Sequence, residues 1–177
     1  MPLIYITGMS GSGKSSVLRD LDALGYETHG VDELGYADWV DRQTGEIIPF
    51  PEDEQSVSIH DWYKKHRWVL SVDRISQLKK QTDTDDKLVF LGGIAEGEET
   101  VWQYFDKVFL LSIDELTIRE RITNRQGNDF GKAPEEMAEI LDTLSRYETK
   151  CQRLGAIQID ATRPLNVVVN EIIEKIG

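Results

Sequence analysis

The chain has 177 residues, of which 40% are hydrophobic and 29% are charged, and this composition predicts one globular domain with a sizeable core. The formal net charge of −12 argues against a general nucleic-acid-binding protein, which needs a positive face to neutralise phosphates. No apolar run is long enough to cross a membrane, and Cys151 is the only cysteine, so we expect a cytoplasmic protein without an internal disulfide or a cysteine-rich metal site.

The first predicted elements are a strand over residues 3–7 and a helix that follows the stretch Gly8-Met9-Ser10-Gly11-Ser12-Gly13-Lys14-Ser15. This stretch has the pattern G-x-x-x-x-G-K-S, the phosphate-binding loop called Walker A. Apolar residues recur at helical spacing after the loop, and Gly25 stands where a helix would end. The motif therefore lies between a strand and a helix, as a phosphate-binding loop does.

The residue types of this loop match the chemistry of holding a nucleoside triphosphate. Glycines allow the backbone to turn its N–H groups toward one phosphate, and the following helix N-terminus attracts the same anion. Lys14 supplies a cation for the β- and γ-phosphates, and the Ser15 hydroxyl is placed to bind Mg²⁺. We predict ATP and Mg²⁺ as cofactors, bound by residues Gly8, Met9, Ser10, Gly11, Ser12, Gly13, Lys14, Ser15 and Ser16.

A second strand is predicted near Tyr26 to Val31, and it ends in Asp32. Ligands bind outside the carboxyl ends of strands in an open α/β sheet, so Asp32 is a candidate base or substrate anchor. Residues 34–59 read as an irregular segment, and its aromatic residues favour an ordered flap over a substrate. Residues from about 33 to 80 are therefore interpreted as a substrate-binding insertion.

A helical pattern is predicted from about Ser58 to Lys80. Arg67 and Arg74 stand seven residues apart in it, so they are predicted to lie on one face of a helix, where they either bind an anionic or polar substrate or form a solvated basic face.

The next strand, Leu88 to Phe90 and onward, ends in Gly92 and Gly93, which would permit close approach of a ligand to the backbone. The strand does not end in an acidic residue, unlike the strand that supplies a magnesium-binding Asp in many phosphate-loop proteins. Glu96, Glu98 and Glu99 are interpreted as a solvated loop.

The rest of the chain alternates strands and helices. A strand is predicted over residues 107–112, helices from about Asp114 and from Pro134 to about Arg153, a last strand over residues 156–160, and a final helix opened by Pro164. The fold class is therefore α/β, with a five-stranded parallel sheet, helices on both of its faces and a single domain over residues 1–177.

At Glu120-Arg121-Ile122-Thr123-Asn124-Arg125 the sequence resembles the R-I-x-x-R motif of the small phosphate-loop kinases, the superfamily that includes adenylate kinase and shikimate kinase. The resemblance extends over essentially the whole chain and implies the phosphate-loop NTPase fold. It implies that Arg121 packs on the adenine ring, that Arg125 reaches the transferring phosphoryl group, and that residues from about 126 to 133 form a short lid. It also implies that Thr162, Arg163 and Pro164 border the adenine.

The sequence does not identify the molecule that accepts the phosphoryl group. The resemblance implies an ATP-dependent phosphotransferase, a monomer or homodimer, that acts on a small molecule and needs neither nucleic acid nor a membrane. Lys14, Asp32 and Arg125 are the predicted catalytic residues, and the predicted substrate-binding residues are Asp32, Arg67, Arg74, Gly92 and Gly93. A nucleoside or nucleotide acceptor is favoured by the aromatic middle segment. The alternatives are a shikimate- or gluconate-type metabolite kinase and a nucleotide-binding regulator without an acceptor.

Overall fold

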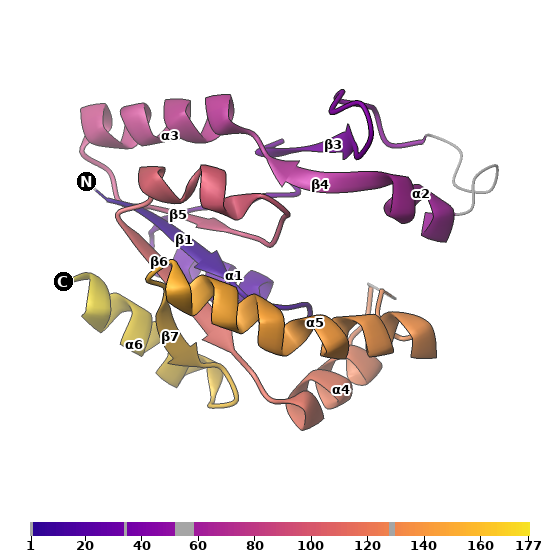
Figure 1. Ribbon diagram of the computed structural model, residues 1–177. Helices are drawn as coiled ribbons and strands as arrows, with labels where there is room; N and C mark the ends of the chain where they lie inside the picture. The colour runs from indigo at the N-terminus through magenta and orange to yellow at the C-terminus, as the bar shows by residue number, and fades with distance from the viewer. Residues whose placement is uncertain (1, 34, 52–58, 128–129) are drawn as a thin grey trace.

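A parallel sheet with strand order β2-β5-β1-β6-β7 lies at the centre of the protein (Figure 1). The computed structural model describes residues 2–33, 35–51, 59–127 and 130–177. The strands of this sheet are β1 (Leu3–Thr7), β2 (Glu27–Gly30), β5 (Val89–Gly92), β6 (Lys107–Ser112) and β7 (Ile157–Asp160). The predicted five-stranded parallel sheet is confirmed, and β1 is buried at every position because it is the central strand.

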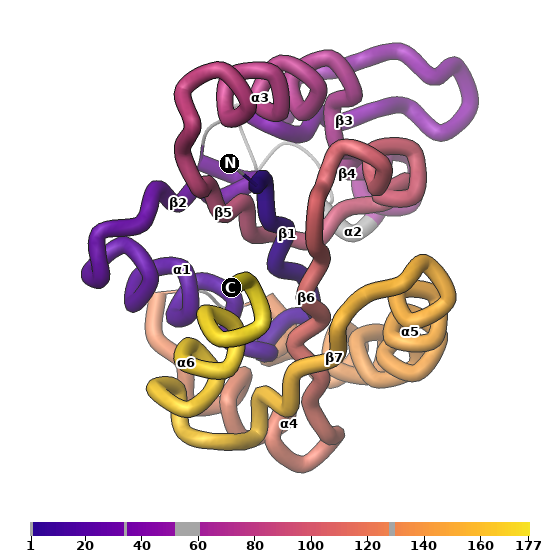
Figure 2. The backbone as a smooth tube through the Cα atoms, turned by 90° about the vertical axis from the view of Figure 1, so that its left-hand side faces the viewer, coloured from indigo at the N-terminus to yellow at the C-terminus, as the bar shows by residue number. Residues whose placement is uncertain are grey.

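Helices cover both faces of this sheet, as predicted. Figure 2 shows α1 (Lys14–Ala23) and α6 (Leu165–Ile176) on one side and α3 (Val72–Asp85) and α5 (Pro134–Arg153) on the other. The alternating side chains of β1 explain this arrangement, because Ile4 and Ile6 belong to the core beneath α1 and α6, and Leu3 and Tyr5 to the core beneath α3. A third cluster joins α4 (Glu115–Asn124) to α5 beside the loop that follows β1.

A second, smaller sheet interrupts the pattern between β2 and α3. Strands β3 (Ala37–Asp41) and β4 (His66–Leu70) pair in antiparallel fashion, and α2 (Ile59–Lys65) leads into β4. The prediction of irregular structure over residues 34–59 is therefore wrong for β3, while residues 34 and 52–58 lie outside the described residues. Trp39 and Trp68 are register partners with ring centroids 5.2 Å apart. Cross-strand aromatic contact of this kind stabilises a strand pair.

The prediction of one helix from about Ser58 to Lys80 is also wrong. The segment is α2, then β4, then α3, and the side chain of Ser71 caps α3 by accepting a hydrogen bond from the backbone N–H of Arg74. Arg67 lies in β4 and Arg74 in α3, so the two arginines do not share a helical face. The physical reason is that a short run of Trp68, Val69 and Leu70 suits a strand as well as a helix, and pairing with β3 selects the strand.

The carboxyl-terminal elements follow the predicted pattern. Helix α4 begins after Asp114, whose side chain accepts a hydrogen bond of 2.7 Å from Thr117 N, and α5 has Pro134 in its first turn. Two short 3₁₀ helices, η1 (Glu98–Thr100) and η2 (Trp102–Tyr104), follow β5, and η1 includes Glu98 and Glu99, which the sequence predicts in a solvated loop. Within the described part of the chain, no helix is both long enough and apolar enough to cross a membrane.

Candidate functional site

The loop between β1 and α1 curls tightly because three of its residues are glycines with positive φ. Gly8, Gly11 and Gly13 have φ values of 153°, 85° and 97°. A Cβ at Gly8 would lie 2.7 Å from the Leu111 carbonyl oxygen and 2.7 Å from Ser12 Oγ, which leaves no room for a side chain. Ser12 Oγ is buried without a hydrogen-bond partner in the structure. The loop therefore has the form of a backbone cradle that only glycine permits.

Lys14 lies over this loop. Its Nζ donates hydrogen bonds to the carbonyl oxygens of Gly8, at 2.6 Å, and of Met9, at 3.0 Å. Burial lowers the pKa of Lys14 to about 8, the charges of Glu98 and Asp32 act to raise it, and the charge of Arg125 lowers it further. The ammonium group thus stands at the N-terminal end of α1, where an anion would also meet the helix dipole.

Ser15 and Ser16 form the first turn of α1 after Lys14. Ser15 is exposed, so its hydroxyl is accessible to a ligand above the loop. No group of three or more His, Cys, Asp or Glu side chains is placed to hold a metal ion among the described residues.

Arg121 joins the phosphate loop to the loop after β7. Its two terminal nitrogens donate to the carbonyl oxygens of Ser12, at 3.3 Å, and of Ala161, at 2.7 Å. The sequence motif at residues 120–125 therefore places Arg121 on the part of α4 that faces the loop, between the two segments predicted to border a nucleotide.

The turn after β7 contains Thr162, Arg163 and Pro164, the residues predicted to border the adenine, and each has different contacts. Thr162 donates from its N and Oγ1 to Asp160 Oδ1, at 3.0 and 2.6 Å, which fixes the turn after β7. The Arg163 guanidinium forms an ion pair with Glu171 on α6, and Pro164 is the N-cap residue of that helix. Arg163 is thus held against α6, and the turn itself faces Arg121.

Arg125 ends α4 and reaches the phosphate loop. Its side chain donates to Ser10 Oγ at 3.3 Å and to the Phe130 carbonyl oxygen. Gly131 N donates to Glu136 Oε2 at 2.7 Å, which ties the end of the predicted lid to α5. Asn128 and Asp129, in the middle of the predicted lid at 126–133, lie outside the described residues.

The predicted acceptor residues do not all gather at this loop. Asp32 is exposed after β2, and its charge acts on Lys14. Arg74 instead pairs with Asp38 at 3.1 Å and donates to the Gly35 carbonyl oxygen, so it fastens α3 to the smaller sheet. Arg67 lies on β4, where its Nε is buried and has no hydrogen-bond partner.

Close packing explains why positions 92 and 93 are glycines. A Cβ at Gly92 would lie 2.5 Å from Leu18 Cδ1, and a Cβ at Gly93 would lie 2.4 Å from Val31 Cγ2. Their backbones are also occupied, since Val31 N donates to Gly92 O at 2.9 Å and Gly93 N donates to Ile6 O at 3.1 Å. Close packing of α1 and of the loop after β2 against β5 therefore accounts for both glycines without a ligand.

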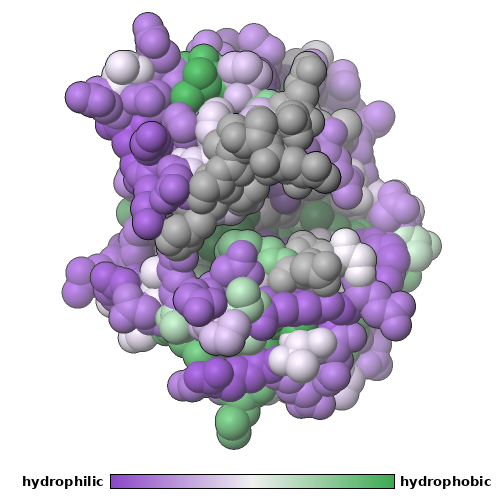
Figure 3. All heavy atoms as spheres, turned by 90° about the vertical axis from the view of Figure 1, so that its right-hand side faces the viewer, coloured by the Kyte–Doolittle hydropathy of each residue, from purple (hydrophilic) through white to green (hydrophobic). Residues whose placement is uncertain are grey.

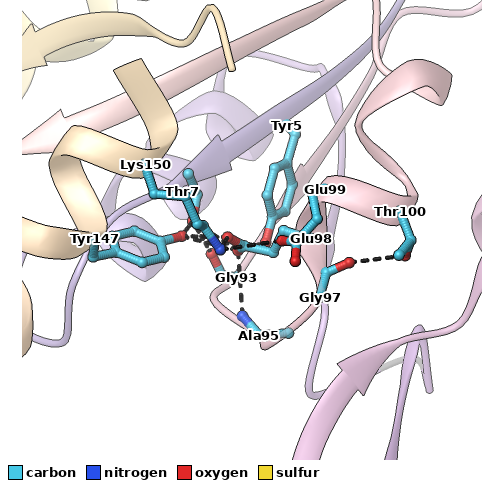
Figure 4. Close-up of polar contacts among 10 residues, drawn as sticks. All are labelled: Tyr5, Thr7, Gly93, Ala95, Gly97, Glu98, Glu99, Thr100, Tyr147 and Lys150. Carbon is cyan, nitrogen blue, oxygen red and sulfur yellow. Dashed lines mark hydrogen bonds and ion pairs between the residues drawn. The ribbon is translucent and has the colours of Figure 1, made fainter. Parts of the chain in front are cut away.

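Glu98 is the residue that the sequence interpretation missed. The prediction of a solvated loop is wrong for Glu98, because its side chain is 0% exposed and accepts hydrogen bonds from the hydroxyls of Tyr5 and Tyr147 (Figure 4). The sequence held one signal: Tyr5 and Thr7 are polar residues in an otherwise apolar central strand, and buried hydroxyls need partners. Glu96, by contrast, is exposed and pairs with Arg42 at 2.9 Å.

The phosphate loop opens onto the face where the strands of the large sheet end. Figure 3 views this face and shows a recess, lined in part by hydrophobic side chains, that separates the upper part of the molecule from the lower part. In Figure 1 the upper part holds β3, β4 and α2, and the lower part holds α4 and α5. A ligand on the loop would therefore lie between these two parts.

Comparisons with known proteins identify the family and the fold of the chain. Residues 4–142 match the model of a family described as AAA domain. A shikimate kinase from Acinetobacter baumannii is 18% identical, over 99% of this chain and 93% of that one, with a TM-score of 0.61. A gluconokinase from Sinorhizobium meliloti 1021 is 21% identical, over 96% and 88%, with a TM-score of 0.51. A deoxyadenosine kinase from M. mycoides is 17% identical, over 99% and 99%, with a TM-score of 0.53. A search of curated proteins found no match. At these identities the structures show a shared fold.

Proposed function

The chain belongs to this AAA domain family and has the fold of the small phosphate-loop kinases, and on this basis we propose that it transfers the γ-phosphoryl group of ATP to a small-molecule acceptor, a nucleoside or nucleotide. One observation carries the proposal: Lys14, Arg121 and Arg125 converge on one glycine loop in a protein of net charge −12. Three cations gathered at a single loop of an acidic protein indicate a polyanionic ligand there.

Each cation has a separate task in this proposal. Phosphoryl transfer depends mainly on positioning and on neutralising the charge of the transferring group. Lys14 and the backbone N–H groups of the loop hold the β- and γ-phosphates, and Arg125, beside Ser10, stabilises the group in transfer. The exposed Ser15 hydroxyl suits Mg²⁺, which prefers water and phosphate oxygens and would add charge neutralisation when bound.

The nucleotide base lies, in this proposal, between Arg121 and the turn that begins at Thr162. Arg121 contacts both the phosphate loop and Ala161, so its guanidinium plane borders the space between them. A guanidinium over an aromatic ring contributes a cation–π interaction. The ion pair with Glu171 holds the Arg163 side chain, so in this proposal Arg163 and Pro164 border the base through their backbone.

The acceptor binds, in this proposal, beside Asp32 and under the insertion at residues 33–80. The charge of Asp32 acts to raise the pKa of Lys14, which supports a position near the transferring phosphate, where Asp32 would orient or deprotonate an acceptor hydroxyl. Within the insertion, Trp39 contacts the rings of Phe50, Tyr63 and Trp68, at centroid distances of 5.8, 5.4 and 5.2 Å. An aromatic surface of this kind favours an acceptor that carries a ring, such as a nucleoside.

A shikimate- or gluconate-type acceptor is the second candidate. The buried Nε of Arg67, which has no hydrogen-bond partner, favours an acceptor with an anionic or hydroxyl oxygen. Both candidates need the short lid at 126–133 to close over the recess, because excluding water keeps ATP from being hydrolysed without transfer.

The test is ADP formation from Mg·ATP across a panel of acceptors that holds nucleosides, nucleoside monophosphates, shikimate and gluconate. Lys14→Ala is the blank, because it removes the phosphate-binding cation. Stimulation by a nucleoside or nucleotide, absent in the blank, supports the proposal, and stimulation by shikimate or gluconate supports the second candidate. ADP formation that no acceptor changes would contradict both.

A further inference from the structure

A cavity lies between η1 and the carboxyl-terminal half of α5. Its volume is about 600 Å³, and small-molecule sites in proteins commonly occupy roughly 300–1,000 Å³. The lining residues with polar or charged side chains are Glu99, Ser145, Arg146, Thr149, Lys150 and Arg153. As far as the chain is described, none of the predicted nucleotide-binding or acceptor-binding residues lines this cavity, so it is separate from the candidate functional site.

Positive charge gathers in this cavity. Arg146, Lys150 and Arg153 follow one another at spacings of four and three residues, so they lie on one face of α5. Glu99 is the one acidic residue among the described residues that line the cavity, so three cations meet one carboxylate. The formal net charge of the chain is −12, and a local excess of cations in such a protein attracts an anion.

Two of these cations have N–H groups that the protein does not use fully. Within the described part of the chain, the exposed Arg153 side chain has no hydrogen bond and no ion pair. Lys150 Nζ lies 3.6 Å from Glu98 Oε2 and 3.4 Å from Glu99 Oε2 (Figure 4). Both distances exceed the roughly 2.7–2.9 Å of a strong charge-assisted hydrogen bond. N–H groups of Arg153 and Lys150 are therefore available to a ligand.

The helix dipole accounts for part of this arrangement. Lys150 and Arg153 lie in the last turn of α5, where a cation stabilises the end of the helix. The dipole effect falls off within that turn, and Arg146 lies before it. The dipole also requires neither a cavity nor the exposed hydroxyls of Ser145 and Thr149 in its wall. A bound anion explains all of these features together.

The lining of the cavity favours a phosphate group that is carried by an organic molecule. Guanidinium, ammonium and hydroxyl groups are the donors that bind phosphate oxygens. Leu154 and the aliphatic parts of Lys150 and Arg153 add an apolar wall, and inorganic phosphate would leave most of the volume empty. A nucleic acid needs cations that continue along its backbone, whereas Asp142, which pairs with Arg146, lies on the next turn of α5.

We propose that this cavity binds a small organic molecule with a phosphate monoester group, whose phosphate contacts Lys150 and Arg153 and whose organic part packs against Leu154. Arg146 adds positive charge at the edge of the site, and the hydroxyls of Ser145 and Thr149 supply further hydrogen bonds. The site goes beyond the proposed function and does not depend on it, because none of its residues takes part in the proposed phosphoryl transfer.

The experiment locates binding by nuclear magnetic resonance, with AMP as the probe because it carries one phosphate monoester. The full chain, labelled with nitrogen-15, is titrated separately with AMP, adenosine and inorganic phosphate, and the backbone amide signals are followed. We expect AMP to shift the amides of Glu99 and of residues 145–154. Adenosine, which lacks the phosphate, should leave them unchanged. AMP bound as an acceptor is recognised separately, because it shifts amides of the insertion at residues 33–80.

Arg153→Ala tests the contact with the phosphate, and the exposed position of Arg153 lets the variant fold. The dissociation constant of AMP, measured from the amide shifts of Ser145 and Thr149, should rise about tenfold, because a hydrogen bond between two charged groups is lost. Arg19→Ala is the matched control, since it removes the same charge from an exposed side chain on α1 that pairs with Asp20 at 3.3 Å. Its dissociation constant should stay within about twofold of the wild type, because solvent and salt screen a distant charge.

The inference is overturned if AMP leaves the amides of residues 145–154 unshifted, or if Arg153→Ala binds AMP as tightly as Arg19→Ala. It is also overturned if adenosine or inorganic phosphate shifts these amides as strongly as AMP, because the phosphate or the organic part then contributes nothing. A parallel titration with Mg²⁺ and a non-hydrolysable ATP analogue follows the amides of residues 8–16. If those amides stay unshifted, the proposed function fails, whatever AMP does at α5.

Discussion

Gly93→Ala decides whether the second glycine after β5 serves packing or the approach of an acceptor. The sequence interpretation favoured the acceptor, whereas the structure places an added Cβ 2.4 Å from Val31 Cγ2 and 2.6 Å from Val31 Cβ. Carbon atoms in ordinary contact lie about 3.5–4.0 Å apart, so the overlap exceeds roughly 1 Å. Val31 Cβ is fixed by the backbone, and Val31 is only 1% exposed, so the side chain cannot rotate away.

We expect Gly93→Ala to lower the free energy of unfolding by about 1–3 kcal/mol, the usual cost of overfilling a packed core. For a chain of this length the melting temperature should fall by roughly 2–12 °C. Urea denaturation followed by circular dichroism measures the change, provided that the slope of the transition stays that of the wild type.

Gly30→Ala is the matched control. Gly30 pairs with Gly92 in the neighbouring strand, and an added Cβ would meet the end of the Glu33 side chain at 3.2 Å, which can move. We expect a change within about 0.5–1 kcal/mol, of either sign. In a double-mutant cycle, Val31→Gly combined with Gly93→Ala should cost less than the sum of the two single changes, by about 0.5–3 kcal/mol.

The packing explanation would be refuted by a Gly93→Ala protein as stable as Gly30→Ala that loses acceptor-dependent turnover. That result would return Gly93 to the acceptor site and imply that Val31 lies elsewhere when substrate is bound.

Three further results are expected. Arg121→Ala should raise the KM for ATP by about 5–30-fold in a coupled ADP assay, because it removes a cation–π contact of roughly 1–2 kcal/mol, and an unchanged KM would remove Arg121 from the base site. Asp32→Asn should lower turnover by about 10²–10⁴-fold with the true acceptor, and near-normal turnover would exclude it as the base. Cys151 is buried with its pKa raised to about 11, so iodoacetamide at pH 7.5 should label it at least roughly a hundredfold more slowly in the folded protein than in urea, as mass spectrometry would show.

Local patterns made most of the large sheet and the phosphate loop predictable. The loop is a contiguous motif, and its flanking strand and helix have clear apolar periodicity, so Lys14 and its neighbours were located without knowledge of the fold. Arg121 and Arg125 were found through a resemblance, and the structure brings both to the loop. The predicted fold is confirmed because its patterns depend on residues close together in the sequence, and the roles of these side chains stay predictions.

The smaller sheet was missed for a physical reason. A short apolar run such as Trp68 to Leu70 suits either a helix or a strand, and only its pairing with residues 37–41 selects the strand. Arg67 and Arg74 then separate, one on a strand and one in an ion pair with Asp38. No local signal near either arginine contains the information about this pairing.

The burial of Glu98 and the packing of Gly93 could not be predicted from the sequence, because their partners are distant or depend on exact packing. Tyr5 lies 93 residues from Glu98 in the sequence and Tyr147 lies 49 residues away, so three separate segments must meet before the carboxylate is buried. A charged residue in a polar loop ordinarily predicts solvation. Likewise, the need for glycine at position 93 arises only when Val31 is packed against it.

Analysis of the phosphorylated product tests the central claim most directly. With γ-labelled ATP, Mg²⁺ and the acceptor that most stimulates ADP formation, the account predicts that the label passes to the acceptor, that the acceptor gains the mass of one phosphoryl group, and that Lys14→Ala transfers none. Label released only as inorganic phosphate, with every acceptor unchanged, would contradict the account and identify the protein as a nucleotide hydrolase.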